Sequence, residues 1–184
     1  MKNVFSLLVL FVVMSPTLWG QPPSAAAPKK EHEWLKQFEG QWSSSSKTVA
    51  APGQPSTECT GSMKSSMLGG FWVVNKMRGH VGEVTFDAMQ TIGYDSKKER
   101  YFGTWVDTMM GHMWHYEGTV DESGKKLILV AEGPDFTGSG KVTKYRDSYE
   151  FKSADLIIAT SEVMGDDGKW VTFMTGEVKR DKPE

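Results

Sequence analysis

Cysteine is almost absent from this sequence of 184 residues, which contains a single one, Cys59. One cysteine cannot form an intramolecular disulfide, so the folded domain must be held together by its hydrophobic core. The length is enough for one domain with a full core and too short for two comfortable ones. We interpret Cys59 as a small buried apolar side chain, with a reactive thiol or an intermolecular disulfide as the alternatives.

An excess of positive charge is also missing. The chain has 21 Lys and Arg against 23 Asp and Glu, for a formal net charge of −2, and its basic residues are scattered in ones and twos. Affinity for nucleic acids comes mainly from Lys and Arg side chains that neutralise phosphates. The composition therefore argues against a nucleic-acid partner.

No apolar run near the N-terminus is long enough for a stable transmembrane helix. The run from Val4 to Met14 has about half of the roughly 20 residues needed to span a bilayer. Lys2 precedes it and a Ser-Pro pair follows it, which is the order of a secretory signal. We predict a signal peptide at residues 1–20, cleaved after Gly20, and export of the mature chain to the periplasm or the extracellular space.

The mature chain begins with a segment of low complexity. Residues 21–30 are rich in Pro, Ala and Ser and are typical of a disordered spacer. In the following segment, residues 31–39, Trp34, Leu35 and Phe38 share one helical face, and Gly40 comes just after it, so we predict a short amphipathic helix. We expect one folded domain over residues 31–181.

From Gly40 onward, short β-rich segments alternate with turn residues. We predict about ten strands, at residues 42–50, 57–67, 71–80, 89–94, 101–107, 112–120, 126–132, 141–152, 156–164 and 170–179. Nothing in the pattern indicates a βαβ unit. Sequential antiparallel strands leave open edges unless the sheet closes, so we expect an all-β barrel of about ten strands with the helix capping one end.

The segment from Tyr101 to Glu117 is dense in aromatic residues, methionine and histidine and is the first place to look for a ligand site. Alternation along the strands gives a shared inner face of Trp105, Asp107, His112, Trp114 and Tyr116, joined by Tyr145 and Asp147 from a later strand. Aromatic rings with a few polar tips suit a pocket for a small apolar or aromatic ligand. The alternative is a barrel packed solid with these rings, which would act as a structural or interaction protein.

Several short motifs carry a resemblance to known barrels. The Gly40-Gln41-Trp42 sequence after the helix resembles the Gly-x-Trp signature of calycins, in which a basic residue of the last strand, here Lys179 or Arg180, packs over the tryptophan. With the segments 93–95, 101–106, 132–138, 144–147 and 164–168, the chain resembles the bacterial family of domain of unknown function fifteen seventy-nine. The resemblance covers about residues 31–180 and implies a calycin-like barrel with structural roles for Gly40, Trp42 and Arg180. It implies no activity.

Cofactor and enzyme alternatives rest on few residues. Met109, Met110, His112 and Met113 offer soft ligands for copper, although apolar gap-filling explains them as well. Nitrobindin, a calycin with haem, uses a histidine in the late strands, whereas no histidine follows His115 here. We therefore expect no cofactor and no bound metal.

Catalysis is the remaining alternative. Nucleophile elbows, phosphate loops and dinucleotide fingerprints are missing from the sequence. His112 with Asp107 or Asp147 would supply a general base for a hydrolase or isomerase. The more common outcome for such a pair is a satisfied polar contact in a core, so we expect a binding protein rather than an enzyme.

Overall fold

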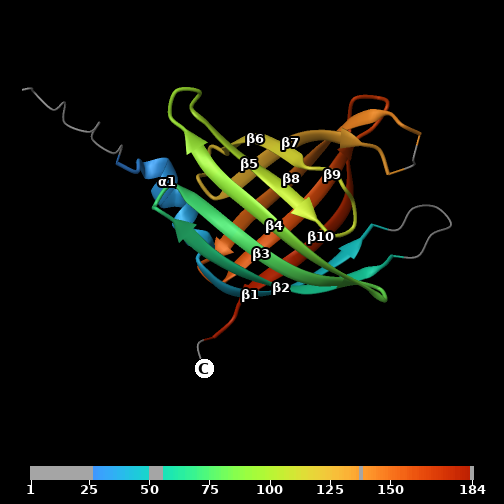
Figure 1. Cartoon of the computed structure of the whole chain (residues 1–184), viewed down its shortest axis with the longest axis horizontal. Helices are drawn as coiled ribbons and strands as arrows, with labels where there is room; N and C mark the ends of the chain where they lie inside the picture. The colour runs from blue at the N-terminus through green and yellow to red at the C-terminus, as the bar shows by residue number, and fades with distance from the viewer. Residues whose placement is uncertain (1–26, 50–55, 137–138, 183–184) are drawn as a thin grey trace, which may run out of the picture.

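The computed structural model describes residues 27–49, 56–136 and 139–182, and these form one closed antiparallel β-barrel with a short helix at one end (Figure 1). The predicted signal peptide, residues 1–20, and most of the predicted spacer, residues 21–30, lie outside the described residues. In chain order, the elements are α1 Lys30–Leu35, the 3-10 helix η1 Lys36–Phe38, β1 Gly40–Thr48, β2 Glu58–Leu68, β3 Trp72–Val81, β4 Val84–Asp95, β5 Arg100–Asp107, β6 Trp114–Val120, β7 Lys126–Pro134, β8 Val142–Ser153, β9 Leu156–Met164 and β10 Trp170–Arg180.

The topology of the barrel is a simple meander. Each strand pairs antiparallel with the next one along the chain, and β1 pairs with β10 to close the sheet. Closure leaves no unpaired strand edge, as the succession of strands predicts. The prediction of an all-β barrel of about ten strands is confirmed.

Most strand boundaries lie within two residues of the prediction, and two of the differences come from the connection between neighbouring strands. Strand β4 begins at Val84 and not at Met89, because Gly82, with φ of +58°, opens a two-residue turn that pairs Val81 directly with Val84. Strand β6 begins at Trp114 and not at His112. Pairing of β5 with β6 begins at Trp105 and Trp114, so His112 lies in the connecting loop.

The N-terminal helix lies across one end of the barrel (Figure 1). Leu35 and Phe38 are fully buried, as the spacing predicts. Two hydrogen bonds anchor the helix to the barrel beneath it. Trp34 Nε1 donates to the carbonyl oxygen of Gly124, in the turn between β6 and β7, at 2.8 Å, and the Tyr101 hydroxyl of β5 donates to that of Glu31 at 3.1 Å. Among the described residues, no helix has the length and apolar character needed to cross a membrane.

Trp42 and Arg180 close the same end of the barrel. Trp42 is fully buried, and its Nε1 donates to the carbonyl oxygen of Phe38 at 2.7 Å. The guanidinium of Arg180 lies 4.0 Å above the Trp42 ring, so Arg180 and not Lys179 is the basic residue over the tryptophan. Gly40 has a φ of +130°, and a Cβ there would come within 2.5 Å of Arg180 Nη1. A side chain at position 40 would therefore displace the guanidinium.

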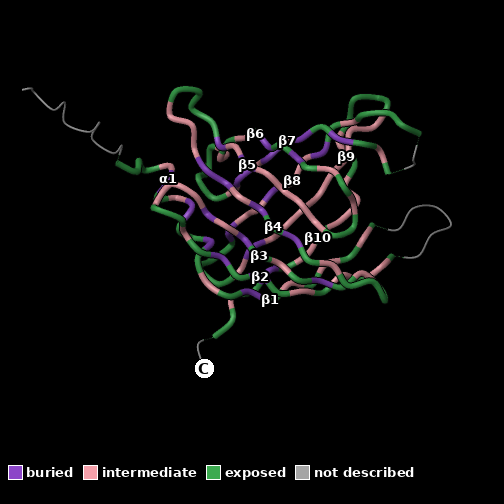
Figure 2. Tube along the Cα trace, viewed as in Figure 1, coloured by how far each residue is buried: buried purple, intermediate pink, exposed green. Residues whose placement is uncertain are grey.

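Packing is densest toward the capped end of the barrel. Buried and exposed residues alternate along the strands (Figure 2), as expected for a barrel with one inner face. The completely buried apolar side chains include Leu35, Phe38, Trp42, Val73, Ile92, Leu127, Leu129 and Ile157. This core holds the strands together at the capped end. Other residues line the interior of the opposite end.

Candidate ligand-binding cavity

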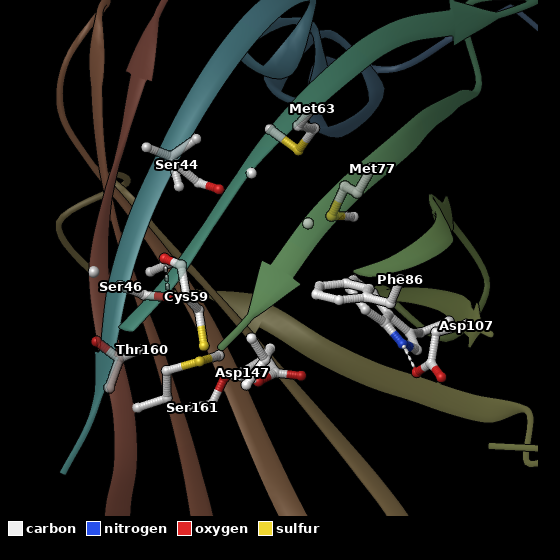
Figure 3. Close-up of a pocket in the computed structure, with 18 of the residues that line it drawn as sticks. Ser44, Ser46, Cys59, Met63, Met77, Phe86, Asp107, Asp147, Thr160 and Ser161 are labelled. Atoms are coloured by element: carbon white, nitrogen blue, oxygen red, sulfur yellow. Dashed lines mark hydrogen bonds between the residues drawn. The ribbon is translucent and has the colours of Figure 1, made fainter. Parts of the chain in front are cut away.

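A cavity of about 390 Å³ occupies the interior of the barrel beyond this core (Figure 3). Its volume lies within the range of small-molecule sites, about 300–1,000 Å³. The large apolar and aromatic side chains in its wall are Met63, Met77, Phe86, Trp105, Met110, Trp114, Tyr116, Tyr145, Tyr149, Ile157 and Phe173. The barrel is therefore hollow, and the alternative of a solid interior does not describe it.

The hollow exists because small residues occupy one side of the wall. At the level of the cavity, strands β1, β2, β3, β9 and β10 contribute Ser44, Ser46, Cys59, Gly61, Gly79, Ala159 and Gly176. Strand spacing enforces some of these, since a Cβ on Gly61 would lie 2.7 Å from the Arg78 carbonyl oxygen. The aromatic side chains of β5, β6 and β8 thus face small residues, and space remains between them.

Aromatic rings pack against one another along the other side. Trp114 and Tyr145 meet edge to face with centroids 4.9 Å apart, and Tyr145 lies 4.9 Å from Phe136. Trp114 packs so closely on Gly133 that a Cβ there would come within 2.2 Å of the ring. The Tyr145 hydroxyl donates to the carbonyl oxygen of Pro134 at 2.9 Å. These contacts fix the ring orientations before any ligand binds.

Asp147 is an acidic residue among these aromatic side chains of the cavity wall. The Tyr116 hydroxyl donates to its Oδ2 and the Ser161 hydroxyl to its Oδ1, each at 2.6 Å, and Figure 3 shows Asp147 and Ser161 side by side. Burial raises the pKa of Asp147, and the two hydrogen bonds oppose that rise. The pKa of Tyr116 is raised well above its ordinary value by burial and by the nearby Asp147 charge.

A row of buried amides crosses the interior next to the cavity. Asn75 Nδ2 donates to Gln90 Oε1 at 3.0 Å, and Gln90 Nε2 donates to the Tyr149 hydroxyl at 3.0 Å, which links β3 and β4 to β8 across the barrel. Asn75 and Gln90 are both fully buried. Asn75 Oδ1 and Ser65 Oγ have no hydrogen-bond partner among the described residues. Burial raises the pKa of Tyr149, so it stays a neutral hydrogen-bonding group.

The structure places the predicted site residues in two groups. Trp105, Asp107, Trp114, Tyr116, Tyr145 and Asp147 line the cavity. Their role in binding a ligand stays a prediction. Asp107, however, has most of its acceptor capacity used. Its Oδ2 accepts from Trp105 Nε1 at 2.7 Å, and its Oδ1 accepts from the amides of Met109 and Met110 at 2.8 and 3.1 Å.

His112 does not lie in the cavity wall, contrary to its predicted place. Its ring packs edge-on against Trp114 at 4.8 Å, and its Nε2 has no hydrogen-bond partner among the described residues. The carboxylates of Asp107 and Asp147 bind other donors and not His112. His112 is displaced because the chain after β5 forms a loop. The Asp107 carboxylate accepts hydrogen bonds from the amides of this loop, and β6 begins only after it. The structure therefore does not assemble the predicted general-base pairs.

The methionines considered for copper binding differ in their exposure to solvent. Met109 and Met113 are 55% and 50% exposed, and of the three methionines Met109 and Met110 line the cavity. In the described part of the chain, no cluster of three or more His, Cys, Asp or Glu side chains could hold a metal ion.

Cys59 is half-buried rather than buried, and its thiol lies at the cavity wall (Figure 3). Burial raises its pKa, which keeps it in the thiol form at neutral pH. Sequence reasoning did not assign Cys59, Met63, Phe86 or Phe173 to the wall. The run of small serines from Ser43 to Ser46 on β1 was the one feature of the sequence that could have indicated an unfilled interior there.

Known structures share this architecture. Rv2717c from M. tuberculosis superposes with a TM-score of 0.61 at 10% identity, covering 85% of this chain and 100% of that one. The S-type phycobiliprotein lyase CPES from Guillardia theta superposes with a TM-score of 0.56 at 14% identity, covering 84% of this chain and 94% of that one. At such identities these likenesses concern the fold.

A comparison with curated proteins finds no match. A comparison with family models gives a match to residues 27–180, which is nearly all of the described chain. With its calycin-like barrel and its Trp42 plug, the chain belongs to the family described as "Protein of unknown function (DUF1579)".

Proposed function

We propose that this protein binds a small apolar or aromatic ligand inside its barrel. The observation that carries the proposal is the cavity of about 390 Å³, walled by aromatic and methionine side chains and provided with a few oriented polar groups. Burial of apolar ligand surface would supply affinity at about 25 cal/mol per Å². The hydroxyl and carboxyl groups of Tyr116, Ser161 and Asp147 would select the orientation of the ligand.

A binding role fits the fixed geometry of the wall. The rings of Trp114 and Tyr145 are held by Gly133 and by the Pro134 carbonyl, so little side-chain entropy is lost when a ligand enters. An enzyme role has less support, because the residue proposed as its base, His112, lies outside the wall. We therefore favour passive binding over turnover.

A dye titration tests the proposal. The neutral dye Nile red should bind wild-type protein with one site and a blue-shifted emission. Ala159 lines the cavity on β9 next to Tyr149 of the neighbouring strand β8, so Ala159→Phe should fill the space and abolish that site. Ala154→Phe is the matched control, because Ala154 is exposed in the turn between β8 and β9 and should leave dye binding unchanged. Equal dye binding by all three proteins would overturn the proposal.

We also propose that the protein is exported. The N-terminal order of Lys2, an apolar run and a Ser-Pro break supports this proposal, and export would place the barrel where it meets ligands outside the cytoplasm. Intact mass measured on protein from separated cell fractions tests it. A chain beginning at Gln21 in the exported fraction is the expected result, whereas a full-length chain confined to the cytoplasm would contradict it.

A further inference from the structure

Asp147 is a cavity acid without a cationic partner. Among the described residues, no ion pair includes Asp147, and its two hydrogen bonds come from the neutral hydroxyls of Tyr116 and Ser161. A carboxylate has about four lone-pair sites, so two hydrogen bonds leave acceptor capacity unused. A carboxylate held in an apolar surround is costly unless a cation or further donors reach it.

The cavity wall offers no basic side chain to supply that partner. Arg78 is the one Lys or Arg residue in the described wall. Its side chain is 66% exposed and pairs with Asp87 at 3.7 Å on the outside of the barrel. A ligand carboxylate would therefore meet an acid with no balancing charge, which disfavours anionic ligands such as fatty acids.

The aromatic rings near Asp147 favour positive charge as well. Tyr116 bonds to Asp147 directly, and Trp114, Trp105 and Tyr145 share the same wall. The faces of such rings attract cations, and the attraction increases when water is excluded. An acid and several ring faces around one apolar space match a molecule that has a cationic end and an apolar body.

We propose that the ligand of this cavity is an apolar amine, whose ammonium group binds Asp147 and whose hydrocarbon or aromatic body lies against the ring and methionine wall. This inference rests on the proposed function and specifies its ligand class. The ammonium carries three N–H donors, and the unused lone pairs of Asp147 can accept hydrogen bonds from part of them. Tyr116 and Ser161 act as positioning residues that hold the carboxylate in place.

Binding of an ammonium group favours the ionised form of Asp147. Burial raises the pKa of Asp147 in the free protein, and a bound ammonium lowers it again by stabilising the ionised form. The titratable groups that face Asp147 are Tyr116 from β6 and Tyr149 from its own strand, and both have a pKa raised by burial. The other acids in the wall are Asp107 at the end of β5 and Glu177 of β10, which is exposed and pairs with Lys179.

Three matched probes test the inference by displacement of Nile red at neutral pH. Phenylbutylamine is cationic, phenylbutanol is neutral and 5-phenylpentanoate is anionic, and all three carry the same phenylbutyl body. The amine should compete about tenfold or more better than the alcohol, since hydrogen bonds to charged groups contribute more than neutral ones, and the acid should compete worst. This comparison uses wild-type protein, so it does not depend on the folding of a variant.

A charge-matched pair of variants assigns the preference to Asp147. Asp147→Asn should lower the amine's advantage over the alcohol, measured as the ratio of the two probe affinities within the same variant, to about twofold or less. Glu132→Gln removes the same charge from an exposed position on the outside of β7 and should keep the full preference.

The outcomes separate the two proposals. Nile red binding without a preference for the amine overturns the amine inference and leaves the binding function standing. Absence of any dye or probe binding contradicts the binding function itself. A preference for the amine that persists in Asp147→Asn overturns the assignment of the site to Asp147.

Discussion

Asp147 illustrates how one residue links the stability of the barrel to its proposed function. The sequence pattern alone places it on an inner strand face, and burial there disfavours its charged form. Tyr116 and Ser161 only partly compensate, because neutral hydroxyls replace water but bring no opposite charge. The free protein therefore keeps an acid that would be better accommodated once a ligand donor reaches it.

This cost should appear as a pH dependence of stability. The folded pKa of Asp147 is raised above its unfolded value of about 3.9, so its protonated form stabilises the fold below that pH. Ionisation should remove this contribution as the pH rises through the folded pKa. We expect the free energy of unfolding of Asp147→Asn to lack this decline, measured by urea titrations from pH 4 to pH 8. Parallel curves for the variant and the wild type would contradict the assignment.

Two glycines show the steric cost of strand contact at the residue scale. A Cβ on Gly118 would lie 1.8 Å from the Ile128 carbonyl oxygen, whereas a Cβ on Gly111 has open space. Gly118→Ala should lower the free energy of unfolding by about 1–3 kcal/mol, because the β6–β7 pair must move apart. Gly111→Ala should stay within about 0.5 kcal/mol of wild type. Equal denaturant midpoints for the two variants would argue against the strand spacing described here.

At the scale of the elements, Arg180 joins the last strand to the N-terminal helix. Its guanidinium donates to the carbonyl oxygen of Glu39, to that of Gln37 at 3.0 Å and to that of Ala154 at 2.9 Å, besides lying over Trp42. The ion pair with Asp155 adds little, because the Asp155 side chain is 76% exposed. Arg180 therefore stabilises this end of the barrel mainly through the hydrogen bonds that its guanidinium donates.

Arg180→Lys tests this role, since lysine keeps the positive charge but lacks the several planar donors of a guanidinium. We expect the free energy of unfolding to fall by about 2 kcal/mol or more, because at least one helix carbonyl loses a charged donor. Lys179→Ala is the control, because Lys179 is exposed and pairs with Glu177 at the surface. Thermal melts that place both variants at the wild-type midpoint would contradict the role of Arg180.

The elements were largely predictable from the sequence, and the exceptions have local causes. Alternating apolar residues identified the inner faces of β3 and β8, including Asn75 and Asp147, because the pleat fixes alternate side chains to opposite faces. The position of His112 could not be predicted, since it depends on which amides the Asp107 carboxylate binds in the loop. Residues an even number of positions apart point to the same face only if the strand is continuous between them.

At the scale of the whole molecule, the barrel is packed at its capped end and open inside toward the other. The closed meander was predictable, because ten sequential strands have few other ways to satisfy their edges. The aromatic side of the cavity was predicted from the alternation along the strands, but its small-residue side was not, because that side depends on which strands lie across from one another. Small residues of β1, β2, β3 and β10 face the rings of β5, β6 and β8 only after closure.

Native mass spectrometry of the whole protein tests the central claim, that the cavity holds a small molecule, most directly. Protein purified without refolding, or supplied with phenylbutylamine, should carry one noncovalent small-molecule adduct per chain. Ala159→Phe should lack that adduct, since the added ring occupies the cavity. A bare chain mass for the wild-type protein under both conditions would contradict the binding function.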